Sequence, residues 1–498
     1  MIQIICKSES YTYNAYHILK AFYPSQEVSC KTDEKASNYV MVHLPDDREI
    51  SVGFENTMEI TDTAGRDEST GKIQEDSEKE SQKKERKRQI DLSLYDQLER
   101  ITGEPLAWGV LTGVRPTKLA MQKLEAGWKK EDYINWAWKS ARVRGEKAAL
   151  AWEIAEREQK ILKELDYENG YSLYVGIPFC PSVCSYCSFS SGPLDRWKEK
   201  VDAYVDALCK ELEFIAERSK NKKLNTIYIG GGTPTTLTAE QLERLMSWID
   251  EKFSREYLLE YTVEAGRPDS ITEEKLKVIK NHDITRISIN PQSMQQKTLD
   301  VIGRKHTVEE IKEAYALARK TGFDNINMDI IAGLPGEDIS DMEDTLAQIA
   351  QMHPDSLTVH SLAIKRAARM EIEDLNRDAK ETQEILSGMI ERAAKAAKEM
   401  DLFPYYLYRQ KNIAGNFENV GYAKVDKAGI YNILIMEEKQ TILAAGAGAS
   451  TKLVLPEKIQ TAGGKKTNLI RIENVKNIME YIHHIDEMIE RKGEWLWH

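Results

Sequence analysis

The chain has no long apolar run. No stretch approaches the roughly 18–20 consecutive apolar residues of a membrane-spanning helix, so we expect no membrane span. The opening residues, MIQIICKSES, lack the basic flank and apolar core of a secretory signal, so nothing favours export. Hydrophobic residues still make up 41% of the 498 positions, which supports packed cores. The length therefore predicts a globular protein of two or three domains.

Cysteine is also scarce, and acidic residues outnumber basic ones. The six cysteines are few and unevenly spaced, because Cys6, Cys30 and Cys209 stand alone while the other three cluster. That distribution excludes a secreted disulfide framework and favours a reducing, cytoplasmic setting. The formal net charge is −12, which gives no general attraction to nucleic acid.

Changes of pattern divide the chain into five segments. Residues 1–61 indicate a small α/β unit, and 62–89 form a charged stretch that is either a linker or a long helix. Residues 90–166 have helical spacing. Residues 167–365 alternate strand-like and amphipathic runs, and 366–498 indicate a C-terminal subdomain or lid. Within this last segment, AGIYNILIM and TILAAGAGAST suggest a pair of strands.

Six strand-like runs give the central segment its character: SLYVGIPF, TIYIGGG, EYTVEAG, RISINPQS, NINMDIIAG and SLTVHSLA. Their alternation with amphipathic helical stretches predicts parallel βα units. We therefore expect an α/β fold with a (β/α)6-type partial TIM barrel. In such barrels reactive groups gather at the carboxyl ends of the strands, so residues that follow the six runs should share one rim.

Three cysteines follow the first of these strands. Cys180, Cys184 and Cys187 form a C-x3-C-x2-C pattern on one loop. A structural zinc site usually has four closed ligands, and no second cysteine pair follows. A 4Fe–4S cluster held by three cysteines leaves one iron open for a ligand. The spacing alone leaves zinc or unliganded thiols as alternatives.

The sequence YIGGGTPTTL places three glycines and Thr233 at the end of the second strand. Taken with the cysteine loop, the motifs YVGIPFCPSVCSYC, IGGGTPT, RISINPQS, IGRKH and NMDIIAGLPG resemble the radical S-adenosylmethionine (SAM) superfamily. More narrowly, the chain is similar to the oxygen-independent coproporphyrinogen III dehydrogenase group. LTGVRPTKL and PYYLYRQKN resemble its HemZ-type branch.

The resemblance implies a 4Fe–4S cluster and one or two molecules of SAM. It implies reductive cleavage of SAM to a 5′-deoxyadenosyl radical, which abstracts a propionate hydrogen from coproporphyrinogen III. Loss of carbon dioxide then leaves vinyl groups and yields protoporphyrinogen IX. The implied partners are the tetrapyrrole substrate and a reduced flavodoxin- or ferredoxin-type electron donor.

The resemblance also implies site residues. The cluster ligands would be Cys180, Cys184 and Cys187, with no catalytic residue beyond the cluster and cofactor. The cofactor contacts would be Tyr174, Tyr186, Gly231, Gly232, Thr233, Glu264, Gln292, Arg304, Asp329 and Ala363. Judged singly, polar residues at strand ends more often complete a barrel rim, whereas together around a cysteine loop they favour a site.

Three departures from the family pattern keep other functions open. Phe189 stands where the coproporphyrinogen enzymes carry a further cysteine, Asn290 begins NPQ in place of GVQ, and GAST replaces GAHS. The alternatives are a haem-binding chaperone on the same scaffold and a radical enzyme that modifies or methylates haem. Four cations are candidate partners for the substrate propionates: Arg115, Lys365, Arg366 and Arg409.

Overall fold

A small four-stranded sheet and one helix form the first part of the chain. The strands run in the order β2-β1-β3-β4, with β1 parallel to β2 and antiparallel to β3. Their bounds are β1 Ile2–Cys6, β2 Val28–Thr32, β3 Val40–His43 and β4 Glu49–Val52, beside α1 Glu9–Phe22. Alternate residues of β1 are buried, as expected for a strand with one face on a core. The first segment therefore contains both strands and a helix, while its extent as a separate unit stays a prediction.

The computed structural model describes residues 1–498 except 25, 54–70, 190, 364–369, 371–378, 410–416, 462–463, 465 and 498, and it gives no side-chain positions for 71–79 and 379–380. Lys365, Arg366 and residues 62–70 of the charged stretch lie outside the described part. From Gly71 that stretch is helical, because α2 runs over Gly71–Thr102 without a break. Three further helices follow: α3 Thr117–Glu125, α4 Lys130–Ala141 and α5 Gly145–Leu162.

Contacts divide the chain into two compact units. One unit consists of 1–155, 377–387 and 408–418, and the other of 156–376, 388–407 and 419–498. The five segment boundaries drawn from the sequence stay predictions.

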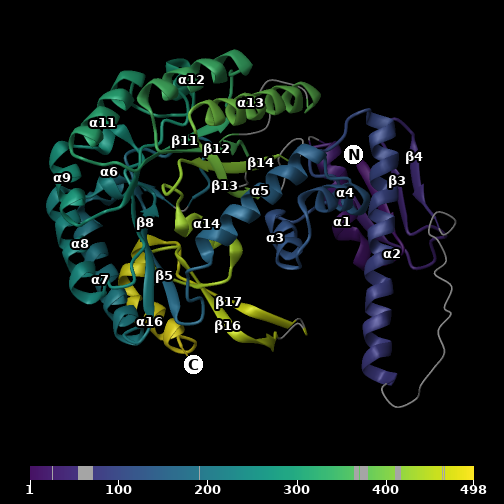
Figure 1. The fold of residues 1–498 in the computed structure, drawn as a ribbon, viewed down its shortest axis with the longest axis horizontal. Coiled ribbons are helices and arrows are strands. Elements are labelled where there is room, and N and C mark those ends of the chain that lie inside the picture. The colour runs from purple at the N-terminus through teal and green to yellow at the C-terminus, as the bar shows by residue number, and fades with distance from the viewer. Residues whose placement is uncertain are drawn as a thin grey trace. The chain divides into compact units, whose positions relative to one another are not determined.

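All six predicted barrel strands are present and parallel to their neighbours. They are β5 Gly170–Ile177, β8 Lys223–Gly231, β9 Glu260–Glu264, β10 Arg286–Ser288, β11 Ile326–Ala332 and β12 Ser356–Ser361. Helices connect them and form an arc along one side of the sheet (Figure 1). These are α7 Val201–Arg218, α8 Ala239–Lys252, α9 Glu273–Asn281, α10 Gln296–Val301, α11 Val308–Lys320 and α12 Ile339–Met352. The fold class is therefore confirmed.

The two faces of this sheet differ sharply in chemistry. Residues such as Leu173, Ile227 and Ile287 on one face are fully buried and apolar, which suits packing against the helices. On the other face, the strand register places a second set of residues side by side, and these residues are mainly polar. They are Ser172, Tyr174, Thr226, Tyr228, Glu260, Thr262, Glu264, Arg286, Ser288, Asn327, Asp329, Ser356 and Thr358. This second face is the inner face of the barrel. It is thus a polar surface, unlike the branched apolar layers that fill ordinary TIM barrels.

The C-terminal segment adds strands to both edges of the barrel sheet. Antiparallel β14 (Glu418–Ala423) pairs with β12, and parallel β15 (Thr441–Ala445) pairs with β5. The other elements are β13 Phe403–Arg409, β16 Ser450–Gln460, β17 Lys466–Glu473, α13 Ala379–Glu399, α15 Ile478–His483 and α16 Ile485–Gly493. The strand predicted at AGIYNILIM is wrong, because Ile430–Glu437 form the helix α14. Two buried backbone amides at its start, those of Ile430 and Tyr431, donate to the Glu260 carboxylate, which caps the helix.

None of the helices that the structure describes is long and apolar enough to cross a membrane.

Candidate functional site

The cysteine loop leaves the carboxyl end of β5. Cys180 lies in the short strand β6 (Phe179–Cys180), which pairs with β7 (Gly192–Pro193) just before α6 (Leu194–Trp197). All three thiols are free, and Thr233 Oγ1 donates to Cys180 Sγ at 3.6 Å. Burial raises the pKa of the Cys180 and Cys187 thiols, and the adjacent cysteines raise it further.

The loop could hold a cluster through its donor chemistry. Three thiols within eight residues supply the soft ligands that iron–sulfur clusters require. As the side chains stand, no three His, Cys, Asp or Glu groups in the described chain already form a metal-binding set. In a cluster held by three cysteines each thiolate binds a different iron, so the three thiols need not meet at a single ion.

Glycines bring the end of β8 against this loop. The amides of Gly232 and Thr233 each donate at 2.7 Å to the carbonyls of Ile177 and Phe179. A Cβ atom on Gly232 would lie 2.6 Å from the Phe179 oxygen, which backbone atoms cannot accommodate. Gly231 has a φ of +111°, a region that glycine adopts at little cost. The glycine run is therefore required for the close approach of β8 to the cysteine strand.

Three stacked tyrosines occupy the inner face beside these glycines. The rings of Tyr174 and Tyr228 have centroids 6.2 Å apart, and Tyr228 stacks on Tyr431 of α14 at 4.5 Å. Tyr228 Oη donates to Glu264 Oε1 at 2.5 Å. Burial raises the pKa of Glu264 to about 7, and the Asp329 carboxylate raises it too, against the lowering effects of the Tyr228 hydroxyl and the Gly231 amide. Glu264 therefore changes protonation state near neutral pH.

Gln292 and Asn290 present unsatisfied groups after β10. Gln292 has a φ of +66°, which is strained for a residue with a side chain. The backbone holds it there, because its amide donates to the Asp329 carbonyl at 2.9 Å and its carbonyl accepts from the Ile331 amide at 2.9 Å. Gln292 Oε1 and Asn290 Oδ1 are buried and have no hydrogen-bond partner within the described residues. Strain and unpaired polar atoms together are typical of a ligand site.

Arg304 lies beside this pair and is only 5% exposed. One terminal nitrogen donates to the Asn290 carbonyl at 2.5 Å, and the other lies 3.5 Å from the Tyr186 hydroxyl. Its Nε is buried without a hydrogen-bond partner in the described structure. The guanidinium is thus fixed in place while its Nε–H stays unpaired among the described residues.

Asp329 and Ala363 complete the predicted set. Asp329 Oδ1 accepts from Asn327 Nδ2 at 2.6 Å, and His360 Nε2 lies 3.8 Å from Oδ2. Although burial raises the pKa of Asp329, its bonds from His360 and Asn327 outweigh that effect and hold the pKa below the usual value. Ala363 lies directly after β12, two residues beyond Ser361. Apart from Tyr186 on the cysteine loop and Arg304 just after α10, the predicted residues lie on barrel strands or shortly after them, and the contacts of the whole set with a cofactor stay predictions.

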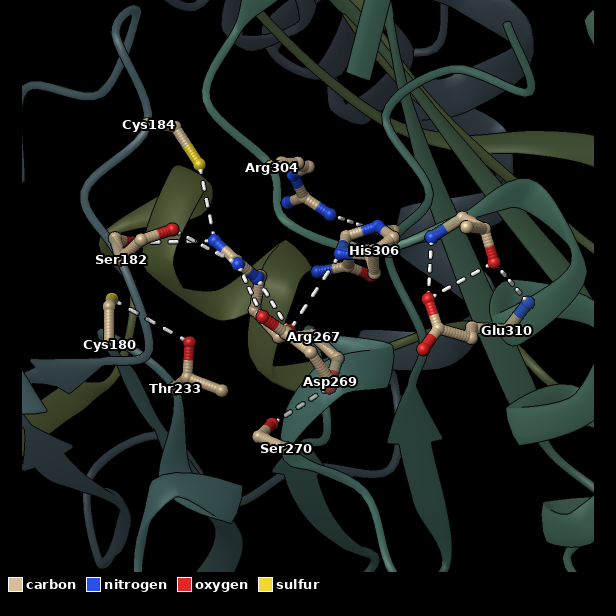
Figure 2. Close-up of polar contacts among 12 residues, drawn as sticks. Cys180, Ser182, Cys184, Thr233, Arg267, Asp269, Ser270, Arg304, His306 and Glu310 are labelled. Atoms are coloured by element: carbon tan, nitrogen blue, oxygen red, sulfur yellow. Dashed lines mark hydrogen bonds and ion pairs between the residues drawn. The ribbon is translucent and has the colours of Figure 1, made fainter. Parts of the chain in front are cut away.

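Sequence reasoning missed Arg267 and Asp269, which follow β9. Figure 2 shows the Arg267 guanidinium between Asp269 and the cysteine loop, with Cys184 Sγ 3.6 Å from Nη1. The available signal was an arginine directly after a strand end, in EAGRPDS. Of the cations suggested as propionate partners, Arg409 is buried, with Nη1 donating to the Leu111 carbonyl at 2.8 Å, and Arg115 is half-buried.

The parallel barrel, its three-cysteine loop and the glycine-rich strand end define a radical SAM protein of the α/β class. A family model described as the Radical SAM superfamily matches residues 174–349. The chain is 39% identical over 480 residues to the oxygen-independent coproporphyrinogen-III oxidase-like protein HemZ of Bacillus subtilis, covering 95% of this chain and 94% of that protein. The chain therefore belongs to the radical SAM family that includes HemN, HemZ and HemW.

Two further similarities bear on this placement. The haem chaperone HemW of Bacillus subtilis is 35% identical over 195 residues, which are 39% of this chain and 51% of that protein. The structure of coproporphyrinogen III oxidase (HemN) from Escherichia coli matches with a TM-score of 0.50 and 22% identity, over 66% of this chain and 73% of that one. The second match shows the fold alone. The family uses a 4Fe–4S cluster and SAM, with which the thiols and unpaired polar atoms described above are compatible.

Proposed function

We propose that the protein is a radical SAM oxidoreductase that decarboxylates two propionates of coproporphyrinogen III to vinyl groups and yields protoporphyrinogen IX. The observation that carries the proposal is the convergence of a three-cysteine loop with the unpaired groups of Gln292, Asn290 and Arg304 at one rim. The substrate class is supported by the likeness to HemZ, which extends over 95% of this chain.

In this proposal Cys180, Cys184 and Cys187 hold the cluster, and the rim residues hold SAM. When bound, the cluster and SAM supply a radical that removes hydrogen from the substrate. Thr233 steadies Cys180 through its hydroxyl, while Gly231 and Gly232 keep the strand ends close enough for backbone contacts.

The remaining rim residues orient the cofactor. The free Nε–H of Arg304 suits a carboxylate, and the free oxygen of Gln292 suits an ammonium group or a hydroxyl. Glu264 and Asp329 offer acceptors for ribose hydroxyls. Tyr174 and Tyr186 provide aromatic surfaces beside these groups, and Ala363 offers its backbone. A reduced flavodoxin- or ferredoxin-type protein would deliver the electron.

The test is anaerobic turnover by cluster-reconstituted protein with dithionite, SAM and coproporphyrinogen III, read by mass spectrometry. We expect substrate-dependent 5′-deoxyadenosine and loss of two carboxyl groups per porphyrinogen. Cys184→Ala should abolish both, whereas Cys209→Ala, which alters a buried cysteine of α7, should retain them. Cleavage of SAM with coproporphyrinogen left unchanged would contradict the proposal.

A haem chaperone is the second candidate. It is favoured by the 35% identity to HemW and by Phe189, which stands 73% exposed in place of the cysteine expected for the coproporphyrinogen enzymes. Stoichiometric haem binding without turnover, in protein that fails the first test, would support this alternative. Methylated or opened haem would instead identify a haem-modifying enzyme.

A further inference from the structure

Arg267 is a buried cation whose five N–H donors all have acceptors. Its side chain is 4% exposed, and a charge so buried is stable only when it is paired and hydrogen-bonded. Nε donates to Asp269 Oδ1 at 2.9 Å and Nη2 to Asp269 Oδ2 at 2.6 Å. This bidentate pair fixes the plane of the guanidinium.

The other three donors contact the cysteine loop (Figure 2). Nη1 donates to the Ser182 carbonyl at 3.3 Å and to Cys184 Sγ at 3.6 Å, and Nη2 donates to Ser182 Oγ at 3.1 Å. A lysine has three donors on a single nitrogen and could not reproduce these five contacts. Arg267 therefore matches this loop through its guanidinium geometry as well as through its charge.

The same loop is held from its other side by the residues after α10. Ser182 Oγ donates to the Gly303 carbonyl at 3.1 Å, and the Ser185 amide donates to the Ile302 carbonyl at 3.1 Å. Ser182 thus accepts from Arg267 while it donates to Gly303. Cys184 lies between Ser182 and Ser185, which these bonds hold in place, and its sulfur accepts from Arg267 Nη1.

We propose that Arg267 is a positioning residue that fixes Cys184 and sets the electrostatic environment of the cluster it ligates. The proposal rests on the cluster ligation proposed above. A buried positive charge beside a ligand sulfur favours the reduced, more negative state of the cluster, whereas the Asp269 carboxylate opposes this effect. Arg267 and Asp269 should therefore shift the reduction potential in opposite directions.

Redox titration followed by electron paramagnetic resonance tests this. In Arg267→Met we expect the equilibrium constant for cluster reduction to fall about tenfold, a shift of about −59 mV for one electron. Asp269→Asn should shift the potential upward, and Arg267→Lys should lie between wild type and Arg267→Met. Unchanged potentials, or shifts of Arg267→Met and Asp269→Asn in the same direction, would overturn the proposal, because a general loosening of the loop has no reason to reverse sign.

A second measurement uses cluster-free protein. Hydrogen exchange of the amides from Ser182 to Cys187 should be faster in Arg267→Met than in wild type. Arg319→Met is the matched control. It removes an arginine of α11 that pairs with Asp355 at 2.7 Å, and it should leave exchange in the cysteine loop unchanged. Equal exchange in Arg267→Met and wild type would overturn the positioning role.

Asp269→Asn and Cys184→Ala separate failure of the proposed role of Arg267 from failure of the proposed cluster ligation. If Arg267→Met does not retain the cluster, the Asp269→Asn potential decides, and a value at or below that of wild type would overturn the proposal. Retention of a full complement of iron by Cys184→Ala would refute the ligation itself. Unchanged potentials alongside loss of iron in Cys184→Ala would refute only the role of Arg267.

Discussion

Glu264 gives the protein a pH dependence that can be worked out from its surroundings. Its pKa rises from 4.5 to about 7, chiefly because of burial. A carboxyl whose pKa is higher in the folded than in the unfolded state stabilises the fold when protonated. That contribution is complete below about pH 4.5 and is lost as the pH rises to about 7.

The magnitude follows from the shift. At about 1.4 kcal/mol per pKa unit, the rise corresponds to at most about 3.5 kcal/mol, and screening of this half-buried group reduces the value to about 2 kcal/mol. Glu264→Gln keeps an oxygen that can accept from Tyr228 but cannot ionise. The free energy of unfolding of Glu264→Gln relative to wild type should therefore rise by about 2 kcal/mol between pH 5 and pH 8.

Urea unfolding of cofactor-free protein provides the assay. Pulsed hydrogen exchange of peptides from β8 and β9 would assign the transition to the unit that contains them. Glu217→Gln, at an exposed position of α7, is the matched control and should show a pH-independent difference from wild type. A Glu264→Gln difference that is flat or falls with pH would refute the reasoning.

Three other substitutions test the packing and the rim. Glu211 is fully buried and bonded to Lys492 Nζ at 2.5 Å. Lys492→Met removes this charge partner, so it should lower the free energy of unfolding by about 3–5 kcal/mol in urea titrations. A loss below about 1 kcal/mol would contradict this. Gln292→Gly should have a free energy of unfolding about 1 kcal/mol higher than Gln292→Ala in thermal unfolding, since glycine adopts the φ of +66° at little cost. Gly232→Ala should weaken SAM binding about tenfold, or about 1.4 kcal/mol, as measured by anaerobic calorimetry, because the added Cβ meets the Phe179 carbonyl at 2.6 Å. Unchanged affinity would show that this loop does not contribute to SAM binding.

The barrel could be predicted because its signals are local. The alternation of short strands with amphipathic helices correctly predicted all six parallel strands, and the sequence motifs correctly predicted the family. The segment Ile430–Glu437 misled because IYNILIME is rich in branched apolar residues, which favour strands. Its helical form depends on distant partners, since Glu260 caps the first amides and Tyr431 stacks on Tyr228. Tertiary contacts of this kind leave no trace in local periodicity.

Arg267 escaped prediction for a related reason. Its position after β9 is visible in the sequence, but its partners Ser182 and Cys184 lie more than 80 residues away. The polar inner face was visible too, as a strict alternation in SLYVG, TIYIG and INMDI. That pattern differs from the continuous apolar runs of parallel strands packed on both faces, so it predicts a barrel whose interior binds rather than packs.

The distribution of satisfied and unsatisfied groups on that polar face indicates where binding occurs. Toward the amino ends of the strands, Thr226 donates to Ser172 at 2.7 Å and Thr262 to Glu260 at 3.0 Å, whereas Arg286 Nε and Ser288 Oγ of β10 have no partner in the described chain. At the carboxyl rim, the side-chain oxygens of Asn290 and Gln292 and the Nε of Arg304 lack partners within the described chain. Each such buried group costs about 1–3 kcal/mol, and a bound ligand that pairs with them recovers that cost. At the rim beside the cysteines, three such groups lie within reach of one ligand, so binding there recovers the cost of all three.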